Sequence, residues 1–84
     1  MLQVLNQVTG ATTRYATRTE ALAAGRRLAR ELATARAFVG LLEDPDDDQL
    51  RIYGTVANAE GRIIEAPPLV QVSFPRSSRR PRRG

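Results

Sequence analysis

Residues 17–35 read TRTEALAAGRRLARELATA, and this stretch decides how the chain folds. Its apolar positions recur at intervals of three and four, which places them on one side of a helix that turns about 100° per residue. Thr17 and Glu20 have the spacing of a capping box, in which two side chains accept hydrogen bonds from free N–H groups of the first turn. Continuing the same periodicity would place Arg36 on the apolar side of this helix. The sequence therefore predicts a helix from about Arg18 to Ala35, with its apolar face formed by Leu22, Gly25, Leu28, Ala29, Leu32 and Ala33.

Strands are expected on both sides of this helix. Residues 2–8, LQVLNQV, alternate well enough for a half-buried strand, and residues 9–13, TGATT, are typical of a turn or an irregular approach to the helix. After the helix, AFVGLL at 37–42 and LRIYGTV at 50–56 are joined by an acidic loop that contains proline. Two β-prone runs joined in this way favour an antiparallel hairpin.

The last third of the chain predicts a second hairpin and a final strand. Gly61 can supply the positive φ of a turn that leads into a short strand at 62–65. Residues 69–74 alternate apolar and polar side chains after Pro67 and Pro68, which interrupt the sheet. This last strand is expected at an edge of the sheet or added to a neighbour's sheet, where it would form the seam with a partner.

These elements predict an α+β domain over residues 1–75, in the order β-α-β-β-β(-β), with one capped amphipathic helix on a small antiparallel sheet. Residues 76–84 have no apolar residue except proline, so they are expected to form a disordered basic tail. With 84 residues and 9.2 kDa, such a domain buries only about 60% of its chain surface. A homodimer or a partner protein would help to stabilise it.

The composition closes most routes to catalysis. The chain has no cysteine, histidine or lysine, so it offers no disulfide, thiolate or imidazole ligand, and no base beside Ser73, Ser77 or Ser78. Its glycines form neither a dinucleotide-binding nor a Walker motif. We therefore expect a non-enzymatic protein with no catalytic residues and no cofactor.

The acidic segment 43–48 has part of the pattern of a metal-binding loop. Asp44, Asp46 and Asp48 have the alternate spacing of calcium loops, but Gln49 and Thr55 stand where an EF-hand requires glycine and a bidentate glutamate. The sequence predicts a solvated hairpin loop without a metal. A weak divalent-cation site stays open as an alternative.

Charge is distributed very unevenly along the chain. Residues 14–36 carry +4, residues 37–75 carry −5 and residues 76–84 carry +5, and all thirteen basic residues are arginine. A GC-rich coding genome would produce this arginine preference by itself, whereas selection for forked guanidinium donors would produce it for phosphate binding.

The basic tail is the strongest functional signal. Clustered arginines neutralise phosphates and release counterions, so they bind the DNA or RNA backbone with little sequence preference. The predicted nucleic-acid-binding residues are Arg76, Arg79, Arg80, Arg82 and Arg83 in the tail and Arg26, Arg27 and Arg30 on the helix, with Arg14 and Arg18 extending the basic stripe.

Other functions remain open at this point. One alternative is a protein-interaction or assembly module, such as a small regulatory subunit or a phage structural accessory, which uses a sheet edge and contacts acidic partners through its tail. Another is that the charges serve solubility alone. The aromatic residues are too few for a base-stacking platform, and only Tyr53 is a candidate for one. The chain has no apolar run of about 18 residues and no signal peptide at its start, so a cytoplasmic location is expected.

Overall fold

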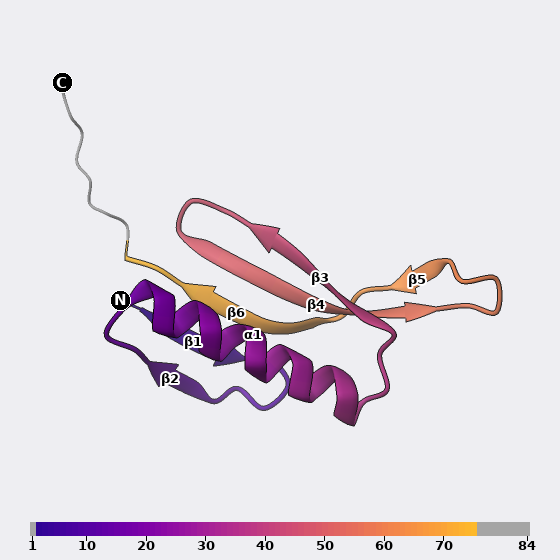
Figure 1. Ribbon diagram of the computed structural model, residues 1–84, viewed down its shortest axis with the longest axis horizontal. Helices are drawn as coiled ribbons and strands as arrows, with labels where there is room; N and C mark the ends of the chain where they lie inside the picture. The colour runs from indigo at the N-terminus through magenta and orange to yellow at the C-terminus, as the bar shows by residue number, and fades with distance from the viewer. Residues whose placement is uncertain (1, 76–84) are drawn as a thin grey trace, which may run out of the picture.

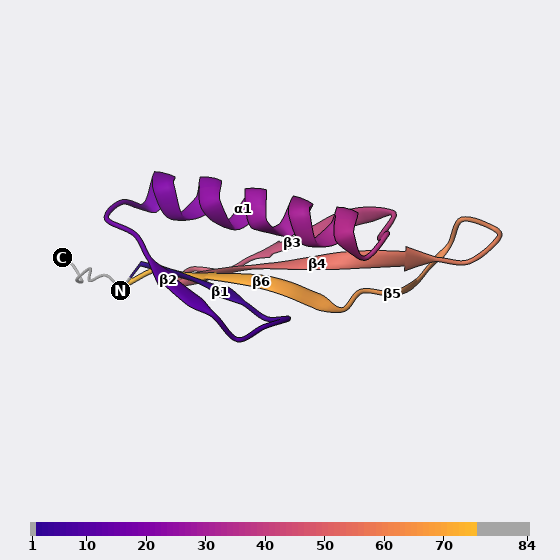
Figure 2. The ribbon, with the colours of Figure 1, turned by 90° about the horizontal axis from the view of Figure 1, so that it is seen from below.

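The computed structural model describes residues 2–75 and has one helix packed on a six-stranded antiparallel sheet, which confirms the predicted α+β class (Figure 1). Figure 2 shows the two layers edge-on, with the helix on one face of the sheet only. The predicted tail, residues 76–84, lies outside the described residues. In chain order the elements are β1 (Gln3–Asn6), β2 (Thr12–Arg14), α1 (Arg18–Ala35), β3 (Gly40–Pro45), β4 (Gln49–Ala57), β5 (Ile63–Glu65) and β6 (Pro68–Ser73).

The strand order is β2-β1-β6-β4-β3, with β5 paired to β4. The prediction that residues 69–74 form an edge strand is therefore wrong, because β6 lies between β1 and β4. Val72 is directly opposite Val4 on one side and Leu50 on the other, and all three side chains are buried. Pairing on both sides uses up the backbone groups of β6, so the seam with a partner cannot form there.

Strand β2 was expected to be part of a turn. The Asn6 side chain accepts hydrogen bonds from the N–H groups of Val8 and Thr9, at 2.9 and 3.1 Å, and Gly10 takes a φ of 85°. The chain thus reverses within residues 7–10, and Thr12–Arg14 then pair with β1. The three exposed residues of β2 have no apolar alternation by which the sequence could have revealed this strand.

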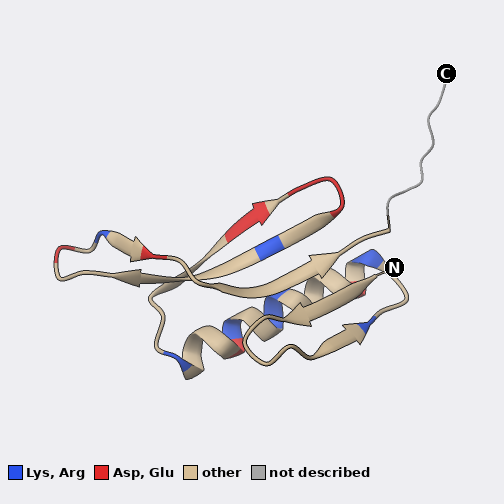
Figure 3. Cartoon of the chain, turned by 180° about the vertical axis from the view of Figure 1, so that it is seen from behind, with Lys and Arg blue, Asp and Glu red and all other residues tan. Residues whose placement is uncertain are grey.

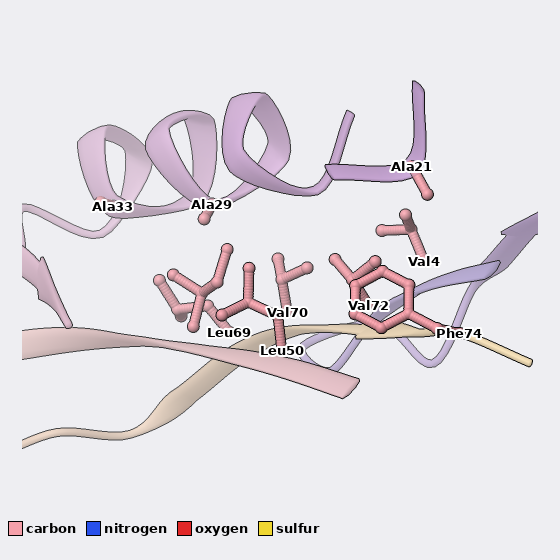
Figure 4. Close-up of a cluster of buried hydrophobic side chains, with 10 residues drawn as sticks. Val4, Ala21, Ala29, Ala33, Leu50, Leu69, Val70, Val72 and Phe74 are labelled. Carbon is pink, nitrogen blue, oxygen red and sulfur yellow. The ribbon is translucent and has the colours of Figure 1, made fainter. Parts of the chain in front are cut away.

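Helix α1 begins and ends where the sequence predicts. The Thr17 hydroxyl accepts a hydrogen bond from the Glu20 N–H at 3.1 Å, and the helix ends at Ala35. Its fully buried positions are a stripe of small residues four apart, and the leucines on either side are half-buried. Figure 4 shows this stripe above the core, which consists of Val4, Ala21, Ala29, Ala33, Leu50, Ile52, Leu69, Val70, Val72 and Phe74.

Gly25 sets the distance between helix and sheet. A Cβ atom at this position would overlap Cγ2 of Val72 and would lie 3.6 Å from Cγ1 of Val70. The backbone of α1 therefore rests directly on the side chains of the central strand. Only glycine permits this approach at position 25.

The predicted strand at 37–42 begins three residues late because the helix terminates through a Schellman motif. The Phe38 N–H donates to the Ala33 carbonyl at 2.9 Å, the Ala37 N–H donates to the Thr34 carbonyl at 3.3 Å, and Ala37 takes a φ of 60°. Glycine is the usual residue at this left-handed position. The turn places the Phe38 ring against Gly54, where a Cβ atom would overlap it. The sequence predicted a bulge or an approaching backbone at Gly54, and the structure has an aromatic ring instead.

Strands β4 and β5 form a hairpin that projects past the C-terminal end of α1 (Figure 1). Its turn confirms the role predicted for Gly61, which has a φ of 83°, and the Asn58 side chain accepts hydrogen bonds from the N–H groups of Glu60 and Arg62. Ile63 and Ile64 on this arm are about 60% exposed. In the part of the chain that the structure describes, α1 is not apolar enough to cross a membrane.

Replacing Ala37 with glycine should stabilise the protein. A left-handed alanine costs about 1–2 kcal/mol, and part of this gain is offset by the greater entropy of glycine in the unfolded chain. We expect Ala37→Gly to raise the free energy of unfolding by about 0.5–1 kcal/mol, which is about 2–8 °C in Tm by circular dichroism. The control Ala23→Gly, at an exposed position inside α1, should lower it by about 1 kcal/mol. A loss of stability in Ala37→Gly would contradict the motif.

Replacing Gly25 with alanine should destabilise the protein, although the same change inside an ordinary helix stabilises it by about 1 kcal/mol. Overlap with Val72 should cost about 1–3 kcal/mol in urea denaturation. In the double variant Gly25→Ala/Val72→Ala the new methyl fills the space left by valine, so the combined loss should be smaller than the sum of the single losses. Additive losses would show that the two residues do not limit the packing.

Candidate nucleic-acid interface

The three arginines predicted on the helix, Arg26, Arg27 and Arg30, are all exposed on α1. Figure 3 shows arginines along α1 and acidic residues gathered on β3 and the loop that follows it. Residues 2–75 carry eight arginines and nine acidic residues, so their net charge is −1. The other predicted residues lie outside the described part of the chain: Arg76, Arg79, Arg80, Arg82 and Arg83.

Arg26 is held by Glu43 on β3. Its Nε donates to one carboxylate oxygen at 2.8 Å and its Nη2 donates to the other at 3.1 Å. These hydrogen bonds lower the pKa of Glu43 and raise the pKa of Arg26, and partial desolvation opposes both shifts. The pair links the helix to the edge of the sheet across 17 residues of sequence. Because Glu43 compensates its charge, Arg26 is the weakest of the three as a phosphate ligand.

Arg27 and Arg30 are the helix arginines that face solvent without such a clamp. Within residues 2–75, the ion pairs with N–O distances of 4.0 Å or less join Arg26 to Glu43 and Arg51 to Asp44. Glu31, four residues after Arg27, does not reach this distance in the described chain. A ligand approaching the outer side of α1 therefore meets two uncompensated guanidinium groups.

The start of α1 lies beside the end of β6. The Arg18 guanidinium lies 4.0 Å from the centre of the Phe74 ring, a cation–π contact, and the Phe74 N–H donates to the Asp48 carbonyl at 2.9 Å. These contacts fix the point from which the chain leads into residues 76–84. This end of the described chain therefore lies between Arg18 of the helix and the acidic loop that contains Asp48.

Shallow hollows run along the side of α1 that faces β1 and β2. One, of about 310 Å³, lies between the helix and the β1–β2 hairpin, with Thr13, Tyr15, Ala24 and Leu28 among its walls. A second hollow shares Tyr15 and Ala24 with it and adds Arg14. Arg27 lines both and also a third hollow farther along the helix. The helix and the edge strand β2 thus enclose a shallow groove of mixed apolar and polar walls, lined by Arg14 and Arg27 and also by Glu20 and Glu31.

The acidic side chains of the segment 43–48 lie at the opposite edge of the sheet. Asp44 is closest to Arg51, at 3.9 Å, and all the aspartates of the segment 43–48 are exposed. In residues 2–75, no three acidic side chains come together in a group that could hold an ion. The alternating spacing of Asp44, Asp46 and Asp48 is therefore not matched by a convergent geometry.

The open face of the sheet, opposite the helix, was not singled out in the sequence. Residues directly opposite each other across the strands share a face, so the neighbours of the buried Val4–Val72–Leu50 row point away from α1. These side chains are half-buried and mostly polar. Tyr53 shares this face, whereas Tyr15 and Phe38 pack against the core, so the described chain has no platform of stacked aromatics. The face comprises Gln3, Leu5, Gln49, Arg51, Tyr53, Gln71 and Ser73.

No protein-family model matches the chain, and no curated protein or solved structure shows a significant match to it.

The ion pair between Arg26 and Glu43 should make stability depend on pH. Because the pKa of Glu43 is lowered by folding, its contribution is present above its unfolded pKa of about 4.3 and is lost as the pH falls through the lower folded value. Both side chains are 40–47% exposed, so the contribution should be only about 0.2–1 kcal/mol.

We therefore expect Glu43→Gln to lower the Tm at pH 7 and to differ less from the unmodified protein at about pH 2.5, because the contribution of the ion pair is lost as the pH falls through the lowered pKa of Glu43. Asp44→Asn is the control, because Asp44 reaches Arg51 only at 3.9 Å and should show a smaller difference at pH 7. A Tm difference for Glu43→Gln that is the same at both pH values would exclude the ion pair as its cause.

Proposed function

We propose that this protein is a non-enzymatic accessory protein that binds the phosphate backbone of DNA or RNA with little sequence preference. The observation that carries the proposal is the segregation of charge. Residues 76–84 carry +5 and the outer side of α1 presents Arg27 and Arg30 without a clamping acid, whereas five of the nine acids gather on β3 and its loop at the far edge of the sheet. Such a protein acts in the cytoplasm.

The packing of α1 supports contact with phosphates rather than with base edges. The helix lies on the sheet through its small-residue stripe, so it presents a side to a ligand and not a free end. Cations spread along such a side match the spaced charges of a nucleic-acid backbone. Phosphate contacts fix position but carry no sequence information.

The charges of the tail, the helix and the acidic segment indicate what each contributes to binding. The tail supplies five guanidinium groups, and Arg18 lies beside Phe74, where the chain leads into the tail. Helix and tail cations can therefore act on one stretch of backbone. The acidic segment 43–48 repels phosphate and orients the domain with β3 away from the ligand.

The proposal is tested by fluorescence-anisotropy titration of duplex DNA and structured RNA at several salt concentrations between about 50 and 200 mM. Each phosphate contact adds about −0.9 to the slope of log K against log salt on duplex DNA, so removing residues 76–84 should flatten the slope by about 4. Arg27→Ala/Arg30→Ala should flatten it by a further 1–2.

Arg62→Ala is the matched control, because Arg62 lies on the projecting β4–β5 hairpin, away from α1, and should leave affinity and slope unchanged. The 1–75 truncation keeps every element of the domain, and its circular dichroism should match that of the full chain. Equal binding by the truncated and full-length proteins would refute the role of the tail, and failure of both to bind would refute the proposed function.

The alternative of an assembly module needs a different seam from the one first expected. Strand β6 is central, so β2 and β3 end the strand order on its two sides, with β5 paired to β4 outside that order. These two edges differ in charge and shape, which favours a specific partner.

A further inference from the structure

The sheet ends on one side at β2, whose outward backbone groups have no partner strand in the described chain. The Asn6 N–H donates to the Ala11 carbonyl at 2.8 Å, and the Tyr15 N–H donates to the Leu2 carbonyl at 2.9 Å. Hydrogen-bonded pairs alternate along an antiparallel ladder, so Thr13 bonds inward to β1. The N–H and C=O groups of Thr12 and Arg14 consequently point away from the sheet.

The sheet ends on the other side at β3, which presents the same spacing of free groups. The Asp46 N–H donates to the Gln49 carbonyl at 2.7 Å, which sets the alternation of the β3–β4 ladder. The outward N–H and C=O groups are therefore those of Leu41 and Glu43. On each edge strand, two residues that are two positions apart point their N–H and C=O groups outward. A strand needs this spacing of donors and acceptors to pair with a further strand and extend the sheet.

The two edges also complement each other in charge. Strand β3 and its loop hold five acidic residues within 43–48, whereas β2 contains Arg14 and borders hollows lined by Arg27 together with Glu20 and Glu31, so the β2 edge is much less acidic. Pairing β3 with a second β3 would bring ten acids together, and pairing β2 with a second β2 would bring Arg14 against its copy. Charge thus favours pairing of unlike edges over pairing of like edges.

Strand direction determines which side chains would meet. Every pairing in the sheet is antiparallel, so β2 and β3 run in the same direction. A copy placed alongside by translation would then continue the sheet with its helix on the same side. Asp44 lies on the open face, like Arg14, and would approach it.

On the helix side of such a seam, Leu41 of one copy would meet the groove between α1 and β2 of the other. Leu41 is 37% exposed, so part of its apolar surface is in contact with water in the free chain. The groove measures about 310 Å³, which is enough for a leucine side chain, and Val4, Tyr15 and Leu28 form the apolar part of its walls. Glu43 lies on the same side of β3, where Arg26 of its own chain holds it.

We propose that copies of this chain associate side by side, with β3 of one copy pairing with β2 of the next to continue the sheet. The contact is heterologous, so it leaves one free edge of each kind at the ends and permits chains or rings of copies. The contact joins a strand of three residues to a strand of six, so association is expected to be weak and to depend on concentration. The proposal does not depend on nucleic-acid binding.

The decisive experiment blocks each edge separately in the full-length, nuclease-treated protein. Thr12→Pro removes an outward N–H of β2 and Leu41→Pro removes one of β3, and neither N–H serves the inner ladders. Sedimentation velocity at up to about 1 mM should show the unmodified protein associating, each variant alone as a monomer, and an equimolar mixture forming a heterodimer, because the mixture has one intact edge of each kind.

Dimers of Thr12→Pro alone would indicate β3–β3 pairing, and dimers of Leu41→Pro alone would indicate β2–β2 pairing; either result overturns the proposal, as does an unmodified protein that stays monomeric. Should a proline variant fail to fold, charge reversal replaces it. Arg14→Asp and Asp44→Arg should each weaken association about tenfold or more, and the double variant should restore it. Arg62→Asp on the β4–β5 hairpin is the control and should leave association unchanged. A double variant that does not recover overturns the proposal.

Discussion

The close approach of α1 to the central strand is the contact on which the rest of the structure depends. Gly25 lies directly over Val72, and the alanines four residues before and after it extend the same stripe. A helix backbone held this near lets short valine side chains fill the space between the layers. A chain of 84 residues has few large apolar side chains with which to fill a core. Dense packing is therefore reached by contact through small residues.

The same contact determines where the charges lie. With position 25 fixed against β6, the residue that follows it faces β3 and the next faces β1 and β2. Arg26 therefore meets Glu43, while Arg27 borders the groove beside β2. Two neighbouring arginines thus have different environments, one compensated by a carboxylate and the other open to a ligand. The leucines on each side of the stripe cover the flanks of the core without reaching its centre.

Local signals in the sequence predicted the local structure. The helix, its cap at Thr17 and the turn at Gly61 all depend on residues within one or two turns of each other. Strand order depends on pairing between distant segments, and the alternation of Val70 and Val72 is the same in a central strand as in an edge strand with one buried face. The Arg26–Glu43 pair escaped prediction for the same reason, since 17 residues and a chain reversal separate its partners. Strand β2 escaped it because three exposed polar residues carry no pattern.

The proposed association and the proposed binding would reinforce each other through geometry. Copies aligned with their helices on one side place Arg30 and Arg18 of every copy on the same surface, with the acidic edge of each copy covered by its neighbour. Covering that edge removes the main repulsion toward phosphate, and linking several weak sites raises avidity without any new contact. Nucleic acid would in turn hold copies side by side at concentrations at which the free edges alone do not pair. Arg27 would take part in both the association and the nucleic-acid binding, because it borders both the groove and the outer side of the helix.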